Sequence, residues 1–236
     1  MPNPSTRPRT RRPNQTTFTR PFPAAVTYDL SVPDQATITV PLGSSWTSGP
    51  HWHEAHTEFL EVLAGRARVT LGSRTLVVGV GAGMGNGDGV LRVERGVVHE
   101  WRRASREDEE EGGEDGGAGG REVEGEGEGE GEDVEELVVK EWTEPKDGAK
   151  EVFFRNLNGL VLDAAGGGGG GGGWRSALLE LELWNLFWRA DNYPVVLGTG
   201  AGWVRRVATK MVMGAAVALG WVLGCRGVYE EYGLGR

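Results

Sequence analysis

Cysteine is almost absent from this chain of 236 residues, since Cys225 is the single one. A lone cysteine excludes an internal disulfide, so the sequence does not support a secreted fold held together by disulfides. The glycines of residues 81–85 have no flanking lysine and precede no predicted helix, which argues against a phosphate-binding loop. The first 23 residues contain no acid and no apolar run typical of a secretory signal.

Histidine is also scarce, and its placement is the main chemical signal of the sequence. All four histidines fall between residues 51 and 99, and Glu58 follows the second of them by five positions. On an extended strand His51 and His53 project to the same face. A turn could then return Glu58 to this pair, and His99 would arrive from a later strand. Imidazole nitrogens with one carboxylate suit a divalent transition metal, so we expect a metal site here.

The spacing of these residues resembles that of a known family. The stretch His51-x-His53-x4-Glu58-x6-Gly65 is similar to the first motif of the cupin superfamily, and residues 94–99 are similar to the second. The resemblance implies a small β-barrel that holds one divalent metal ion, iron, manganese, nickel or zinc. The implied ligands are His51, His53, Glu58 and His99. Turn positions depart from the family's pattern, with Ser45 and Asp88 in place of glycine, Glu94 in place of proline and Arg103 in place of asparagine.

Other side chains near the motifs have a structural interpretation. His56 is expected to be a polar surface or core group rather than a ligand. Glu54 and Glu61 are expected to be solvated carboxylates. Trp52 and Trp101 lie beside the ligands and could line a pocket, although a tryptophan on a barrel strand more often serves packing.

Short segments rich in β-branched residues and separated by glycine predict a mainly β fold. The predicted strands are residues 36–40, 57–63, 66–71, 75–80, 90–93, 98–102, 136–144 and 151–156. Periodicity alone does not distinguish one kind of barrel from another. The cupin resemblance implies a double-stranded β-helix, a jelly-roll barrel within residues 24–160, followed by a C-terminal helical extension.

Composition divides the rest of the chain. Residues 1–23 are basic and rich in proline, which predicts a disordered arm; the prolines oppose the amphipathic helix of a mitochondrial presequence.

Residues 107–136 contain 16 acids and one base among many glycines, so we expect a disordered acidic insert. The negative net charge of −9 therefore comes from the insert, since the rest of the chain has more bases than acids. Residues 161–173 predict a glycine-rich linker.

Residues 174–236 predict a helical region with an apolar character. Residues 211–225 carry no charge, and extending them to 207–229 gives a length sufficient to cross a membrane. The alternative is a buried or dimer-forming helix, for which Gly220 and Gly224 give a suitable small-residue spacing. If the segment spans, Arg205, Arg206 and Lys210 would keep the barrel in the cytoplasm. The basic arm lacks interleaved aromatic residues, so no nucleic-acid partner is expected.

Two functions remain open from the sequence. The first is a metal-dependent cupin enzyme acting on a small organic substrate, with oxygenation ahead of decarboxylation or isomerisation. No general acid or base is identified, and Glu61 and Glu94 are candidates only by their position in the sequence. The second is a non-catalytic cupin that binds a small molecule or a protein while its C-terminal helix attaches it to a membrane or to a second copy.

Overall fold

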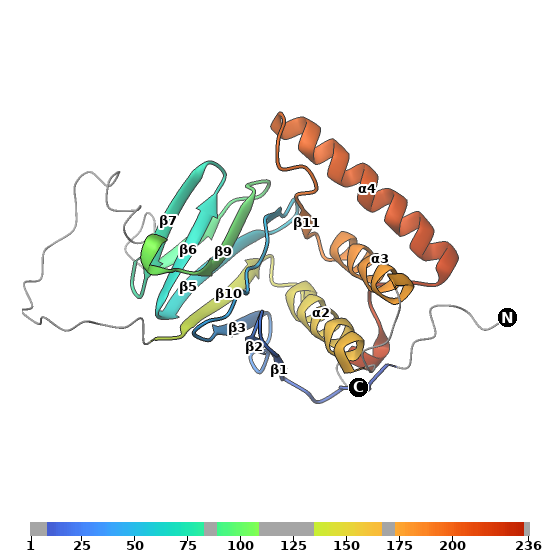
Figure 1. The fold of residues 1–236 in the computed structure, drawn as a ribbon, viewed down its shortest axis with the longest axis horizontal. Helices are drawn as coiled ribbons and strands as arrows, with labels where there is room; N and C mark the ends of the chain where they lie inside the picture. Colours follow the sequence, from blue (N-terminus) through green and yellow to red (C-terminus); the bar gives the residue numbers. More distant parts are fainter. Residues whose placement is uncertain (1–8, 83–88, 109–134, 167–172, 234–236) are drawn as a thin grey trace, which may run out of the picture.

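The chain forms two antiparallel sheets followed by helices (Figure 1). The computed structural model describes residues 9–82, 89–108, 135–166 and 173–233. One sheet has the order β1-β2-β3-β10-β5-β8, and the other has the order β11-β4-β9-β6-β7.

The first sheet comprises β1 (Thr17–Arg20), β2 (Val26–Asp29), β3 (Gln35–Val40), β10 (Leu137–Glu144), β5 (Thr57–Ala64) and β8 (Val90–Val93). The second comprises β11 (Tyr193–Pro194), β4 (His51–Trp52), β9 (His99–Arg103), β6 (Arg66–Leu71) and β7 (Arg74–Gly79). The helices are α2 (Ala149–Gly166), α3 (Gly173–Arg189) and α4 (Gly202–Leu223), with a 3-10 turn η1 (Glu230–Tyr232) near the C-terminus.

Alternating burial along the strands explains why these segments form sheets. In β3 and β10 every second residue is buried, as the side-chain period of two in a strand requires. Ile38 and Val139 point inward from the first sheet and share one apolar core with Val69 and Trp101 of the second. The core therefore lies between the sheets. The predicted mainly β fold with a C-terminal helical extension is confirmed.

One predicted strand is wrong. Residues 151–156 belong to α2 instead. Taken alone, these six residues with their two phenylalanines are compatible with a strand or with a helix. Over the longer stretch, Phe153, Leu157 and Leu160 recur at helical spacing and pack against the core, so burial of one helix face decides the structure.

The prediction of a disordered basic arm is wrong for residues 9–23. Residues 17–20 form β1, which pairs with β2. Arg12 forms an ion pair of 2.6 Å with Asp163 of α2, and Arg9 forms one of 2.8 Å with Glu182 of α3. Because these acids lie far along the chain, composition near the N-terminus could not reveal them. Residues 1–8 lie outside the described residues.

Two further segments fall partly outside the described residues. The acidic insert predicted at 107–136 is described only at its two ends. At the first end, Asp108 binds Arg68 and Arg102 at 3.0 and 2.7 Å. The glycine-rich linker predicted at 161–173 is wrong at both ends, since residues 161–166 continue α2 and residue 173 begins α3.

Helix α4 lies at the outer side of the helical region, beyond α3 (Figure 1). Among the described residues it is the one helix that is long and apolar enough to cross a membrane. Only 17% of its most apolar 18-residue segment is buried inside the protein. Its inner side is held by the protein, because Thr209 donates to the carbonyl of Pro194 and Asn185 of α3 donates to the carbonyl of Ala216. Helix α4 is therefore held along one side, and much of its remaining surface is exposed. Whether it spans a membrane or pairs with a second copy stays a prediction.

We predict that the contact between α3 and α4 depends on Gly220. A methyl group at this position would overlap the buried side-chain amide of Asn185, whereas one at Gly214 of the same helix would meet no atom within 4 Å. Gly220→Ala should lower the free energy of unfolding by about 1–3 kcal/mol through overpacking. Gly214→Ala should be neutral or stabilise by up to about 1 kcal/mol, since alanine favours the helix. Urea unfolding of the full chain measures both; equal effects would contradict the prediction.

Candidate metal centre

Three strands bring the candidate ligands together at one end of the core. His51 lies on β4, and His53 follows directly after that strand. Glu58 lies near the start of β5, and His99 begins β9, where it pairs with His51. One ligand atom from each of these four residues lies within 4.8 Å of the other three, and all four residues are buried. The structure thus groups the predicted residues, and their role as ligands stays a prediction.

The backbone fixes the orientation of all three imidazole rings. The Nδ1 atoms of His51, His53 and His99 contact the carbonyl oxygens of Gly49, Asp191 and Val97 at 2.7, 2.6 and 3.0 Å. A carbonyl oxygen can only accept a hydrogen bond, so each Nδ1 carries the proton. Nε2 is then the ring nitrogen that can offer a lone pair, and Nε2 of His53 and of His99 faces the carboxylate of Glu58. Such outer contacts are typical of histidines that bind metals.

The carboxylate of Glu58 faces two of these nitrogens. Its Oε2 lies 3.2 Å from Nε2 of His53, and its Oε1 lies 3.1 Å from Nε2 of His99. Two acceptors cannot share such a distance unless a proton or a cation lies between them. A divalent ion bound by Nε2 atoms and a carboxylate oxygen satisfies this requirement without charging the rings. The chemistry of the donor set therefore fits a metal.

Burial and hydrogen bonding set the charges in the cluster. Burial lowers the pKa of His51 well below its ordinary value, which keeps this ring neutral. Burial would also lower the pKa of His99, but the hydrogen bond and charge of Glu58 raise it. Burial would raise the pKa of Glu58, but the charge of Lys150 and the two histidine contacts hold it well below the ordinary value. Glu58 is therefore ionised.

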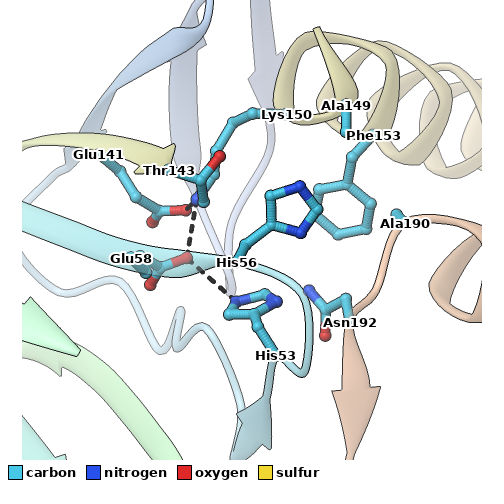
Figure 2. A pocket seen from close by; sticks show the side chains of 10 residues that line it. All are labelled: His53, His56, Glu58, Glu141, Thr143, Ala149, Lys150, Phe153, Ala190 and Asn192. Atoms are coloured by element: carbon cyan, nitrogen blue, oxygen red, sulfur yellow. Dashed lines mark hydrogen bonds and ion pairs between the residues drawn. The ribbon is translucent and has the colours of Figure 1, made fainter. Parts of the chain in front are cut away.

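Lys150 and Glu141 form the other side of the cluster. Lys150 begins α2 and donates to Oε2 of Glu58 at 2.7 Å and to the carboxylate of Glu141. Figure 2 shows its side chain reaching between these two acids. Burial and the charge of Glu58 raise the pKa of Glu141. One buried ammonium group thus links a strongly acidic carboxyl to a weakly acidic one.

A small pocket adjoins the cluster (Figure 2). Its cavity volume is about 30 Å³, enough for about two or three water molecules. The barrel contributes His53, His56, Glu58, Glu141 and Thr143 to its wall. Helix α2 and the loop after α3 contribute the remainder, Ala149, Lys150, Phe153, Ala190 and Asn192. The C-terminal extension therefore closes one side of the site.

Asp191 connects this extension to the loop that carries the candidate ligands. Its carboxylate accepts hydrogen bonds from the backbone N–H groups of Glu54, Ala55 and His56, at 2.7 to 3.1 Å. Its carbonyl oxygen fixes the ring of His53. Asp191 has a φ of 52°, a left-handed conformation that aspartate tolerates better than most residues. The C-terminal extension therefore orients His53 directly and holds the loop between His53 and Glu58.

The remaining candidates lie outside the cluster. His56 contacts Asp191 and Asp147 through its two ring nitrogens and only borders the pocket, in agreement with its structural interpretation. Glu61 pairs with Lys140 at 3.0 Å and Glu94 with Arg92 at 2.9 Å. Neither lines the pocket, so neither is placed for proton transfer there.

The two tryptophans serve packing. Trp52 stacks on Tyr193 with ring centroids 5.6 Å apart, and Trp101 packs against Trp46 at 4.8 Å. Both are almost completely buried, and neither borders the pocket beside the cluster.

The sequence interpretation missed Glu141, Lys150 and Asp191. For Glu141 a signal existed, because it alternates with Leu137 and Val139 and so occupies an inward position of a predicted strand. Lys150 and Asp191 carry no comparable signal, since helix α2 and the long-range contact of the loop after α3 place them.

The two antiparallel sheets and the buried cluster agree with the fold and the ligand set that the cupin resemblance of the sequence implies. No protein-family model and no curated sequence matches the chain. Solved structures with similar folds include KdgF from Halomonas sp., at 12% identity and a TM-score of 0.33 over 60% of this chain and 97% of that one.

Two further similar structures are cupins by description. One is an RmlC-like cupin from Shewanella frigidimarina, at 11% identity and a TM-score of 0.33 over 57% of this chain and 89% of that one. The other is a cupin-like protein from Thermotoga maritima, at 15% identity and a TM-score of 0.32 over 60% and 82% of the two chains.

We predict that Asp191 supports metal binding from outside the ligand set. Asp191→Gly keeps the left-handed backbone and the carbonyl contact to His53 but removes the carboxylate that holds residues 54–56. The affinity for Zn(II) should fall by about 10- to 100-fold, as for other lost outer contacts. Competition with a chelating dye measures this change.

The matched control is Asp147→Asn, which alters the other carboxylate on His56 and leaves the loop contacts intact. Its Zn(II) affinity should equal that of the parent. An unchanged affinity in Asp191→Gly, or an equal loss in both variants, would contradict the prediction.

Proposed function

We propose that the protein is a metal-dependent cupin enzyme that acts on a small organic substrate. The observation that carries the proposal is the buried cluster of three imidazoles and one carboxylate, in which every Nδ1 contacts a backbone carbonyl and Nε2 is left as the ligand atom. His51, His53, Glu58 and His99 would hold one divalent ion, either iron, manganese, nickel or zinc. Such an ion supplies Lewis acidity and, if it is iron, manganese or nickel, reactivity with dioxygen.

The residues beside the cluster suit an anionic reactant. The ammonium group of Lys150 lies at the pocket wall, where it can stabilise negative charge on a bound acid or enediol. Glu141 shares this ammonium and has a raised pKa, so it can hold a proton and return it to the substrate. We therefore assign Lys150 to charge stabilisation and Glu141 to proton transfer, in place of Glu61 and Glu94.

The size of the pocket limits the reactants. A cavity of about 30 Å³ admits dioxygen or the coordinating end of a small acid, and a larger substrate requires α2 or the loop after α3 to move. This restriction favours a small acid, diketone or enediol as the reactant. Oxygenation, ahead of decarboxylation or isomerisation, is the reaction that we propose for it.

A second candidate function follows from the contacts of Glu58. Its carboxylate is within hydrogen-bonding distance of His53, His99 and Lys150, so protonated rings could complete a buried ion-pair network. The protein would then be a non-catalytic cupin that binds a small molecule or a protein.

Metal analysis of the full chain separates the two functions. After reconstitution and desalting, the parent should retain about one equivalent of metal, and His51→Ala/His99→Ala should retain none, because one carboxylate and one imidazole bind weakly. His56→Ala is the matched control and should retain the metal of the parent, since His56 lies outside the cluster. Circular dichroism verifies that each variant is folded.

The metal-loaded parent is then assayed for oxygen uptake with small acids, diketones and enediols. Turnover that is lost in Lys150→Met while metal is retained would support the roles assigned above. Absence of bound metal in the reconstituted parent, or equal retention in the double variant, would contradict the enzyme proposal.

A further inference from the structure

The outward side of α4 is apolar along its whole length. Its exposed positions follow helical spacing and form a continuous row, here named the α4 stripe: Trp203, Val207, Met211, Ala215, Leu219 and Val222. Trp203 is 70% exposed and Met211 is 71% exposed, and the neighbouring Trp221 is 84% exposed. At 1.5 Å per residue the stripe extends for about 30 Å. A soluble monomer rarely exposes so large an apolar surface.

An apolar groove continues the α4 stripe toward α3. It has a volume of about 480 Å³ and is lined mainly by Trp174, Leu178, Trp184, Leu219 and Leu223. Leu219 belongs to both the groove and the stripe, and Trp174 is 60% exposed beside them. The two helices thus present one connected apolar surface, with exposed tryptophans near both of its ends.

The charges on α4 are positive, and Glu180 of α3 is an acid that lines the groove. Helix α4 contains Arg205, Arg206 and Lys210 and no acid, and the exposed Arg226 follows its end. Lys210 turns back to Glu54 and Arg206 to the carbonyl of Gly96, so the cations border the stripe without interrupting it. Tryptophan with flanking lysine or arginine is the pattern of helices at the boundary between lipid and water.

The inner contacts of α4 disfavour a membrane-spanning helix and pairing with a second copy through small residues. Pairing with a second copy through small residues is not available, because Gly220 faces Asn185 and Gly224 ends the helix with a φ of 76°. Crossing a bilayer would require α4 to leave α3 and β11. That movement would break the contacts of Thr209 with Pro194 and of Lys210 with Glu54.

We propose that the α4 stripe lies flat on an anionic lipid surface while α4 stays docked on the protein. The apolar side chains enter the boundary between head groups and acyl chains, and the exposed Arg206 and Arg226 contact anionic head groups. This mode attaches the protein to one leaflet, in contrast to the spanning anchor considered for residues 207–229.

Vesicle sedimentation of the full chain tests the proposal. The parent is mixed with phosphatidylcholine vesicles with or without phosphatidylglycerol, and should bind the anionic vesicles more tightly. Met211→Ser/Trp221→Ser removes two of the most exposed apolar side chains and should bind them about tenfold more weakly. The matched control is Phe22→Ser/Val80→Ser, which alters side chains that are 60% and 65% exposed away from α4 and should bind as the parent does.

Each outcome decides the proposal. Selective loss in the α4 variant, together with release of the parent by alkaline carbonate, would support flat attachment. Resistance of the bound parent to carbonate would indicate a span and overturn it. Equal loss in both variants, or no binding to anionic vesicles, would also overturn it. A dimer detected by light scattering that dissociates in the α4 variant, without vesicle binding, would assign the surface to a second copy.

Discussion

The carboxylate of Glu58 is almost completely buried, and an ionised group in that position requires partners of opposite charge or strong donors. Its partners come from separate parts of the fold: His53 from the end of β4, His99 from β9 and Lys150 from α2. Two sheets and a helix must therefore meet at this point before the group is stable. A bound cation would meet this need for a partner of opposite charge. It would also separate the carboxylate oxygens of Glu58 from the imidazole nitrogens, which are acceptors that would otherwise face one another.

The C-terminal extension is part of the site rather than an appendage of the barrel. Helix α2 supplies the ammonium group beside Glu58, and Asp191 holds the loop between β4 and β5 from the far end of α3. Helix α4 reaches the same loop through Lys210 and Glu54. A surface that attaches α4 to lipid is thus linked, through named contacts, to the loop beside the candidate ligands. The fold places the chemistry and the proposed attachment on one connected unit.

The sequence predicts the parts of the structure that depend on local spacing. The separation of His51, His53 and Glu58 and the alternation along β3, β5 and β10 are local properties, and the structure agrees with them. The role of Asp191 and the pairing of Arg12 with Asp163 depend on contacts across more than a hundred residues, which no local pattern encodes. The strand predicted at residues 151–156 is wrong for a related reason. The short apolar run is compatible with a strand or a helix, and burial of one face of the longer helix α2 decides for the helix.

X-ray absorption at the metal edge tests the central claim most directly. The full chain is loaded with one equivalent of Zn(II) and compared with His99→Ala. The account predicts a first shell of nitrogen and oxygen at about 2.0–2.2 Å with scattering from three imidazoles in the parent and two in the variant. A shell of oxygen alone, or the same imidazole scattering in parent and variant, would contradict it.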